Sequence, residues 1–219
     1  EATGIWKQVI TVGDLVRVTT GYGDYKVKFE PNYDKTPYFE YPVEKTSKKD
    51  SGVCIVHSPY RLKDGTVPKN LYRITVDPYR HDQTASGVSI GSICVMENIN
   101  KITPYRGDKI VAWYDGRPTT QKDFNDILFN LAMLYNCKIA PENDEPGGIV
   151  DYAKTNKLLP FLEAEFELAY DVKMATKRKS GKVGMHIGSG KDDLRRKQGD
   201  LMMAEWFMRP RGVDSNGNI

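Results

Sequence analysis

Two acidic residues stand where strands are expected to end, which makes them candidates for metal ligands. Residues 71–76 form a β-branched run that should stop at Asp77, because Pro78 lacks an N–H and restricts the residue before it. A second short strand, over residues 137–140, ends at Pro141-Glu142. If these strands are parallel neighbours, the carboxylates of Asp77 and Glu142 meet at one sheet edge, and like charges that close need a cation between them.

Such a pair of carboxylates indicates phosphodiester chemistry. Carboxylate oxygens select Mg²⁺ or Mn²⁺ rather than zinc. Two such ions are the usual device for cleaving a phosphodiester, one activating a water and the other stabilising the leaving oxygen. Each acid alone has a simpler explanation, because an Asp before Pro commonly forms a turn and residues 142–145 are polar enough for a solvated loop. The pairing of the two acids is what favours a site.

The elements that would position these acids indicate an α/β fold. Three strands with short connections, over residues 71–76, 88–96 and 109–114, predict an antiparallel meander. Residues 119–136 have one apolar face at helical spacing and begin with a capping-box pattern, Thr120 with Asp123. Because a crossover helix joins parallel strands, the strand at 137–140 should run parallel to an earlier one. We further expect helices over 147–159 and 191–208, and a strand over 182–187.

The region before residue 71 has a different character. It is β-rich and irregular, with β-prone runs at residues 9–12, 15–19, 25–29 and 52–57 and a proline-rich loop over 31–50. We therefore divide the chain into a β-rich extension, residues 1–70, packed beside a second unit, residues 71–219.

A basic strip lies late in the chain. Residues 173–197 hold nine basic and two acidic residues, a local net charge of +7 in a chain whose total is +3. Charge runs are commonly solvated loops, but a basic strip on an otherwise acidic protein also suits a polyanion such as DNA. The candidate phosphate contacts, which would position DNA without reading its sequence, are Lys177, Arg178, Lys179, Lys182, Arg195, Arg196 and Lys197.

Several other chemistries have little support. The three cysteines are far apart and form no zinc or disulfide pattern, so we expect buried thiols. The Gly188-Ser189-Gly190-Lys191 segment lacks the glycine and the hydroxyl residue of a phosphate loop, since Met185 and Asp192 stand at those positions. The histidines are scattered, and no apolar run could cross a membrane.

Residues 71 to about 211 resemble the nuclease domain of the large terminase of tailed phages. The run 72–78 with Asp82 and Ser89 is similar to its first catalytic strand. Residues 112–118, the long helix, and Ile139-Ala140-Pro141-Glu142-Asn143 followed by Gly147-Gly148 are similar to its second acidic motif. The resemblance implies a ribonuclease-H-like mixed sheet with flanking helices.

By that resemblance Asp77 and Glu142 are metal ligands, and Asp82 is an auxiliary acid. The Lys191-Asp192-Asp193-Leu194 segment resembles the family's third acidic motif, which leaves open whether Asp192 or Asp193 faces the metals. A helix-capping role for these two acids is equally compatible with their position. The basic Arg195-Arg196-Lys197 that follows departs from the family pattern, which turns apolar sooner.

The resemblance implies a metal-dependent endonuclease that cuts double-stranded viral DNA during genome packaging. Its partners would be the packaging ATPase domain of the same polypeptide, the portal and the small terminase subunit. It would work in the host cytoplasm, transiently at the procapsid portal. Two alternatives stay open: another nuclease of this fold, such as a junction resolvase or integrase, or a non-enzymatic adaptor that binds nucleic acid or protein and needs no metal.

Overall fold

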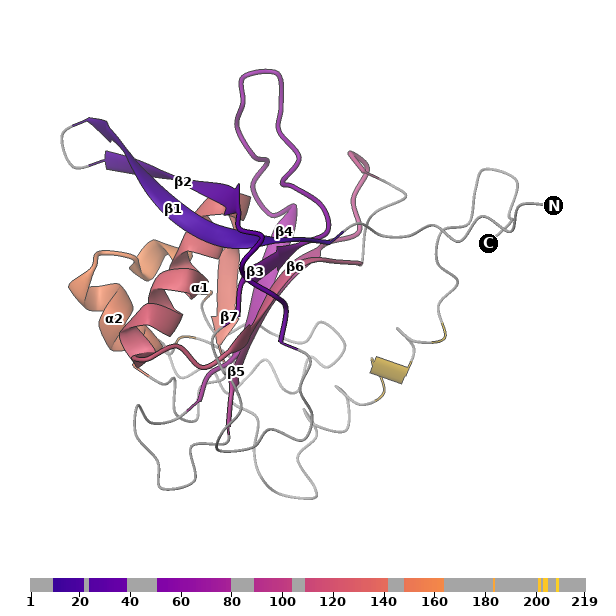
Figure 1. Cartoon of the computed structure of the whole chain (residues 1–219). Helices are drawn as coiled ribbons and strands as arrows, with labels where there is room; N and C mark the ends of the chain where they lie inside the picture. The colour runs from indigo at the N-terminus through magenta and orange to yellow at the C-terminus, as the bar shows by residue number, and fades with distance from the viewer. Residues whose placement is uncertain are drawn as a thin grey trace, which may run out of the picture.

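The computed structural model describes residues 10–21, 24–38, 51–79, 89–103, 109–141 and 148–163, with the single positions 183, 201, 203, 204 and 208. Within these residues the chain has a mixed α/β architecture (Figure 1). The strands are β1 (Thr11–Gly21), β2 (Asp24–Pro31), β3 (Val53–Ile55), β4 (Tyr72–Asp77), β5 (Gly91–Glu97), β6 (Lys109–Gly116) and β7 (Lys138–Pro141). The helices are α1 (Gln121–Tyr135) and α2 (Ile149–Thr155), followed by the 3-10 turn η1 (Leu159–Phe161).

All seven of these strands form one sheet in the order β2-β1-β3-β6-β5-β4-β7. The predicted meander is confirmed, because β4 pairs antiparallel with β5 and β5 pairs antiparallel with β6. The predicted crossover is also confirmed: α1 carries the chain from β6 to β7, which pairs parallel with β4. The carboxyl ends of β4 and β7 therefore lie at the same edge of the sheet.

The strands of the N-terminal region continue this sheet. β3 pairs with β6, and β1 pairs with both β3 and β2, in each case antiparallel. Arg17 of β1 also reaches α1, where its Nε donates to Asn130 Oδ1 at 2.8 Å and its Nη2 lies 2.7 Å from Asp126 Oδ1. The division into residues 1–70 and 71–219 stays a prediction, but its two sides share backbone pairing and an ion pair.

The long helix begins and ends as its sequence predicts. Thr120 is the N-cap, and its side chain accepts from the backbone N–H of Asp123 while the Asp123 carboxylate accepts from the backbone N–H of Thr120. Asn136 adopts a left-handed φ of 47° at the C-cap, a conformation that asparagine tolerates better than most residues. No helix among the described residues is long and apolar enough to cross a membrane.

Several element boundaries differ from the predicted ones, and three of them have a local explanation or bear on the site. β5 begins at Gly91 rather than at residue 88, because its partner β6 ends at Gly116, opposite Gly91, and Pro118 follows. β6 itself continues to Gly116, past the predicted end at residue 114. The second helix ends at Thr155 rather than at residue 159, because Lys157 has a left-handed φ of 59°. Of the late helix predicted over 191–208, the structure describes Leu201, Met203, Ala204 and Met208, and all four are helical.

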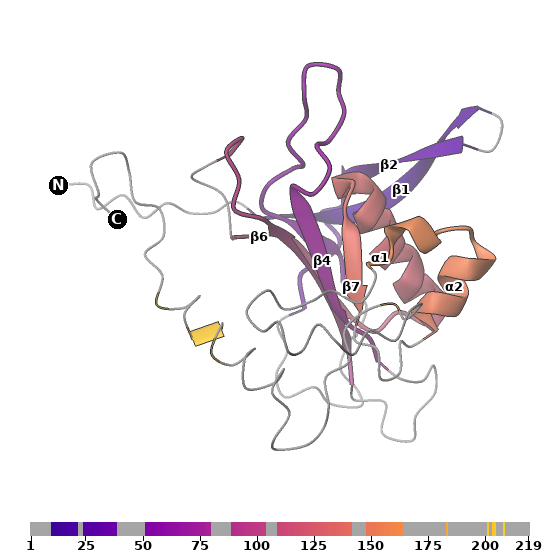
Figure 2. The same ribbon diagram turned by 180° about the vertical axis from the view of Figure 1, so that it is seen from behind.

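The two faces of the sheet have different environments. On β4, Tyr72, Ile74 and Val76 are buried in the core, whereas Arg73, Thr75 and Asp77 are exposed. Tyr72 meets Tyr135 of α1 edge-on, with the ring centroids 5.0 Å apart, so the buried face is the one that α1 covers. Both views place α1 and α2 on the same side of the sheet (Figures 1 and 2). We call the other side, which carries Asp77, the open face.

Candidate active site

Asp77 is the last residue of β4, as predicted, and its side chain is exposed. The β-branched run before it alternates between core and open face, and Pro78 cannot donate a further ladder hydrogen bond. The strand therefore presents this carboxylate at the carboxyl edge of the sheet and on the open face.

The second predicted strand tip lies beside the first. In the parallel pair β4–β7, Ile74 is opposite Ile139 and Val76 is opposite Pro141. Glu142, the next residue in the sequence, lies outside the described residues. The structure thus shows that the two strands are neighbours and end at the same edge of the sheet.

The other predicted site residues also lie outside the described part of the chain. These are Asp82, Asp192 and Asp193 among the acids, and Lys177, Arg178, Lys179, Lys182, Arg195, Arg196 and Lys197 among the phosphate contacts. Their roles stay predictions.

Two residues that the sequence did not single out lie in one row with Asp77. Asp77 of β4 is directly opposite Ser92 of β5, and Ser92 is directly opposite Asp115 of β6. Directly opposed residues of an antiparallel pair project to the same face, so all three side chains are on the open face. With adjacent strands about 4.8 Å apart, the Cα atoms of Asp77 and Asp115 are roughly 10 Å apart. The one feature of the sequence that could have indicated Asp115 as a site residue was its position directly after the predicted strand 109–114.

A hydrogen bond orients the middle residue of this row. Ser92 Oγ donates to Asp115 Oδ1 at 2.6 Å. A serine hydroxyl has one proton and two lone pairs, so the proton is committed to Asp115 and Oγ can only accept from, or coordinate, anything else that approaches it. Ser51 donates its hydroxyl to the carbonyl oxygen of Asp115, which further fixes the end of β6.

The nearby thiols are held in the protonated form. Burial, together with the negative charge of Asp115, raises the pKa of Cys94 to about 11 and that of Cys54 to about 12. Burial alone raises the pKa of Cys137. All three cysteines are free; Cys54 and Cys137 are buried as predicted, whereas Cys94 is half-buried. A protonated thiol is a poor nucleophile and a poor metal ligand.

The donor atoms around Asp77 suit a hard cation. They are carboxylate and hydroxyl oxygens, which match the preferences of Mg²⁺ and Mn²⁺. Within the described residues, no group of three or more His, Cys, Asp or Glu side chains gathers closely enough to hold a metal ion.

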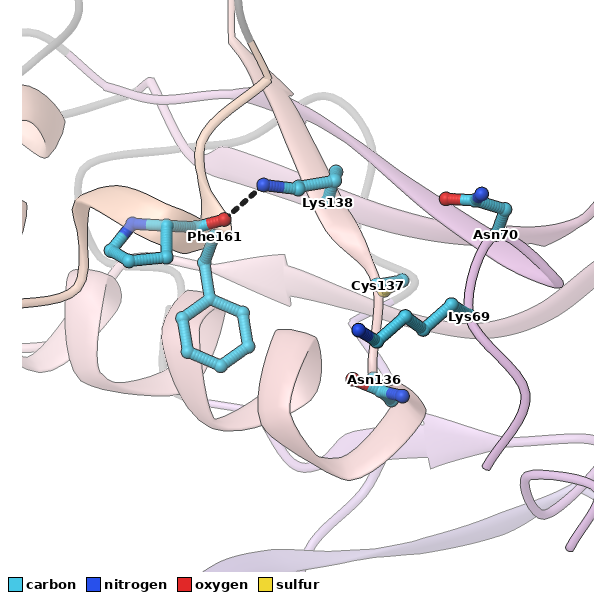
Figure 3. Close-up of a pocket in the computed structure, with 7 residues that line it drawn as sticks. Lys69, Asn70, Asn136, Cys137, Lys138 and Phe161 are labelled. Atoms are coloured by element: carbon cyan, nitrogen blue, oxygen red, sulfur yellow. Dashed lines mark hydrogen bonds between the residues drawn. The ribbon is translucent and has the colours of Figure 1, made fainter. Parts of the chain in front are cut away.

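A separate pocket of about 320 Å³ lies at the other end of β4 and β7. Figure 3 shows its lining residues, which come from the end of α1, the start of β7, η1 and the segment before β4: Lys69, Asn70, Asn136, Cys137, Lys138, Pro160 and Phe161. Lys138 Nζ donates to the carbonyl oxygen of Pro160, and Asn136 Nδ2 donates to that of Val67 at 2.7 Å. These contacts hold the ends of the elements together, at the edge opposite Asp77.

Comparison with known proteins identifies no relative. The chain matches no protein-family model, no curated protein and no solved structure.

Proposed function

We propose that this chain is a metal-dependent endonuclease that hydrolyses phosphodiesters of double-stranded DNA, as the nuclease part of a phage large terminase does during genome packaging. The observation that carries the proposal is the parallel pairing of β4 and β7, with Val76 opposite Pro141. A register continued by one residue would bring Glu142 opposite Asp77. Residues at corresponding positions of parallel neighbours project to the same face, so both carboxylates would lie on the open face.

The sheet supports a ribonuclease-H-like assignment. In that fold type a three-stranded antiparallel meander is followed by a crossover helix and a strand parallel to the first. Here β4, β5 and β6 form the meander, α1 is the crossover and β7 pairs with β4. The N-terminal strands β1–β3 lengthen the sheet on the β6 side and leave the β4–β7 edge unchanged.

Each residue has a role in this proposal. Asp77 and Glu142 would hold Mg²⁺ or Mn²⁺, with Asp192 or Asp193 as a third acid and Asp82 as an auxiliary. The ions would supply an activated water and a counter-charge for the leaving oxygen. Ser92, with its proton committed to Asp115, offers a lone pair one strand away from Asp77. The basic strip between residues 173 and 197 would hold the duplex by its phosphates.

Calorimetric titration with Mn²⁺ tests the proposal. The wild-type chain should bind Mn²⁺ with measurable heat, and Asp77→Ala should abolish that heat. The matched control is Asp151→Ala, which removes another exposed carboxylate, this one from α2, where its only ion pair among the described residues is a 3.3 Å contact with Lys154. It should bind Mn²⁺ as the wild type does.

Cleavage assays then separate the alternatives. With Mn²⁺ or Mg²⁺ the wild type should cut plain linear duplex DNA and leave 5′-phosphate ends. A strong preference for four-way junctions would instead favour a resolvase. If neither the wild type nor Asp77→Ala produces heat with Mn²⁺, the result counts against the nuclease proposal and favours the non-enzymatic adaptor.

A further inference from the structure

The pocket at the start of β7 has walls that are held in place by the sheet. Its volume of about 320 Å³ is at the lower end of the range of small-molecule sites. The wall that carries Phe161 is held on β7, because the backbone N–H of Glu163 donates to Ile139 O at 2.8 Å. The wall before β4 is held by the residue after β5, because Asn98 Nδ2 donates to Asn70 O at 2.9 Å. The pocket is therefore formed before any ligand arrives.

This pocket carries positive charge that its own lining does not offset. Of the seven described residues that line it, two are lysines and none is acidic. Lys69 has no hydrogen bond or ion pair with any other described residue. Lys138 Nζ donates to the carbonyl oxygen of Pro160, a neutral group, which leaves two further N–H donors for a ligand. Two ammonium groups beside one hollow favour an anion.

The carboxyl end of α1 does not account for these lysines. The end of a helix carries partial negative charge on its last carbonyl oxygens, which favours nearby cations. Here Ala132 O and Met133 O accept from the backbone N–H of Asn136, and Ala132 O also accepts from that of Cys137. The helix end is thus satisfied by backbone groups, and its last turn contains no basic residue.

An aromatic ring and an amide add features that charge alone does not. The Phe161 ring is half-buried and forms one wall of the pocket (Figure 3). An aromatic face suits a planar ring of a ligand, and nucleobases stack on such faces. The Asn70 side chain has no hydrogen-bond partner among the described residues, and its amide can both donate and accept. The edge of a nucleobase offers donors and acceptors in the same way.

We propose that this pocket binds a phosphorylated nucleoside, with its phosphate at Lys69 and Lys138 and its base against Phe161. A phosphate monoester carries a charge of about −1.5 to −2 near neutral pH, which matches two ammonium groups, whereas a carboxylate would offset only one. A free nucleotide and the phosphorylated end of a DNA strand both present this chemistry. The pocket lies at the edge opposite Asp77 and needs no divalent metal, so the proposal is independent of the nuclease activity.

Titration calorimetry of the full chain with deoxyadenosine monophosphate tests the proposal, in a buffer with a chelator of divalent metals. Lys69→Met should weaken binding about 10-fold or more, because it removes a charged donor to the phosphate. Lys69→Arg keeps the charge and should recover part of the affinity. The matched control is Lys63→Met, which removes an exposed lysine outside the pocket and should bind as the wild type does. Since Lys69 has no partner, the melting temperature of Lys69→Met should equal that of the wild type.

A series of probes identifies the ligand class. Deoxyadenosine lacks the phosphate, and phenyl phosphate lacks the base edge, so each should bind several-fold more weakly than deoxyadenosine monophosphate. Phe161→Leu should weaken binding of the nucleotide more than binding of inorganic phosphate. A 5′-phosphorylated dinucleotide that binds more tightly than the nucleotide, and that loses this binding in Lys69→Met, makes a strand end the source; weaker binding makes a free nucleotide the source.

Three results would overturn the proposal. The first is no binding of deoxyadenosine monophosphate to the wild type, with ligand-detected NMR as the check for binding without heat. The second is equal affinity of the wild type and Lys69→Met, which would make the lysines a solvated part of the surface. The third is equal affinity for phenyl phosphate and the nucleotide, which would show that no base is recognised. Because no divalent metal is present, none of these results bears on Mn²⁺ binding or on cleavage.

Discussion

Val76 and Pro141 lie directly opposite each other in β4–β7, the one parallel strand pair of the described sheet. Each is followed in the sequence by an acidic residue, Asp77 and Glu142. Adjacent parallel strands are about 4.8 Å apart, so a register continued by one residue would place these two acids within the span of a shared cation or of a disulfide.

The register of β4 and β7 predicts that cysteines introduced at positions 77 and 142 can form a disulfide. With Asp77 and Glu142 both replaced by cysteine, in a Cys94→Ser background that removes the half-buried thiol from the open face, mild oxidation should link the two positions. Disulfides form readily where the Cα atoms are about 4.4–6.8 Å apart. Non-reducing peptide mapping by mass spectrometry detects the linked peptide.

A matched pair serves as control for this cross-link. Asp77→Cys with Lys138→Cys joins the same two strands, but Lys138 is opposite Arg73, roughly 13 Å from Asp77 along the strand. This pair should remain reduced. Absence of the first cross-link, or equal formation of both, would mean that Glu142 is not opposite Asp77.

Local signals in the sequence predicted the elements that carry the candidate site. Pro78 ends β4 after Asp77, and Thr120 with Asp123 begins α1, since both effects act within a few residues of the chain. The crossover rule then predicted that β7 is parallel to an earlier strand, because a helix between strands reverses the chain direction twice.

The row across the open face could not be predicted in the same way. Asp77, Ser92 and Asp115 are opposite one another only because of the exact registers of β4–β5 and β5–β6. A shift of one residue in either register would turn Ser92 to the core face, and single-sequence patterns do not fix a register to one residue. The pairing of β3 with β6 likewise depends on contacts between distant parts of the chain.

Ser92 should contribute to metal binding. Its hydroxyl proton is committed to Asp115, so Oγ offers a lone pair beside Asp77. Ser92→Ala should weaken Mn²⁺ binding about 10-fold, a loss typical of residues that support metal ligands, and titration calorimetry measures it. Thr19→Ala, which removes an exposed hydroxyl from β1, is the control. Equal affinities for the wild type and both variants would remove Ser92 from the site.

Thiol labelling reports the charge of Asp115. Burial and the Asp115 carboxylate raise the pKa of Cys94 to about 11, so at pH 8.5 almost none of it is thiolate. Asp115→Asn should lower this pKa and speed alkylation by iodoacetamide roughly two- to five-fold, since the rate below the pKa follows the thiolate fraction. Peptide mass spectrometry measures the rate for each cysteine. Cys137, whose pKa is raised by burial alone, should show no change; unaltered labelling of Cys94 would contradict the prediction.

The junction between β1 and α1 should weaken in acid. Partial burial raises the pKa of Asp126, but hydrogen bonds from Lys122 and Tyr152 and the positive charge of Arg17 outweigh it, so the pKa lies below its usual value. A depressed pKa means that the carboxylate stabilises the fold at neutral pH. This stability is fully present above the unfolded-state pKa of about 3.9 and is lost as the pH falls through the lower folded-state pKa.

Asp126→Asn tests this dependence by urea unfolding at pH 7 and at pH 3. At pH 7 the variant should lose about 1–2 kcal/mol of unfolding free energy, discounted for screening because the side chain is 24% exposed. At pH 3 the difference in unfolding free energy between wild type and variant should be smaller, since the wild-type carboxylate is then becoming protonated. If the difference in unfolding free energy is the same at both pH values, packing rather than charge holds β1 against α1.

Gly91 should be intolerant of even a methyl group, because it lies against the ring of Phe124. A Cβ added at Gly91 would be 2.4 Å from Phe124 Cε2, and Phe124 is fully buried between its aromatic neighbours Tyr79 and Tyr114. Since the ring cannot withdraw, Gly91→Ala should destabilise the protein by about 1–3 kcal/mol in urea unfolding. Phe124→Leu makes room, so the double variant should be less destabilised than the sum of the two single changes. Strict additivity would mean that the ring is not the obstacle, and that β5 accommodates the methyl group by shifting its backbone.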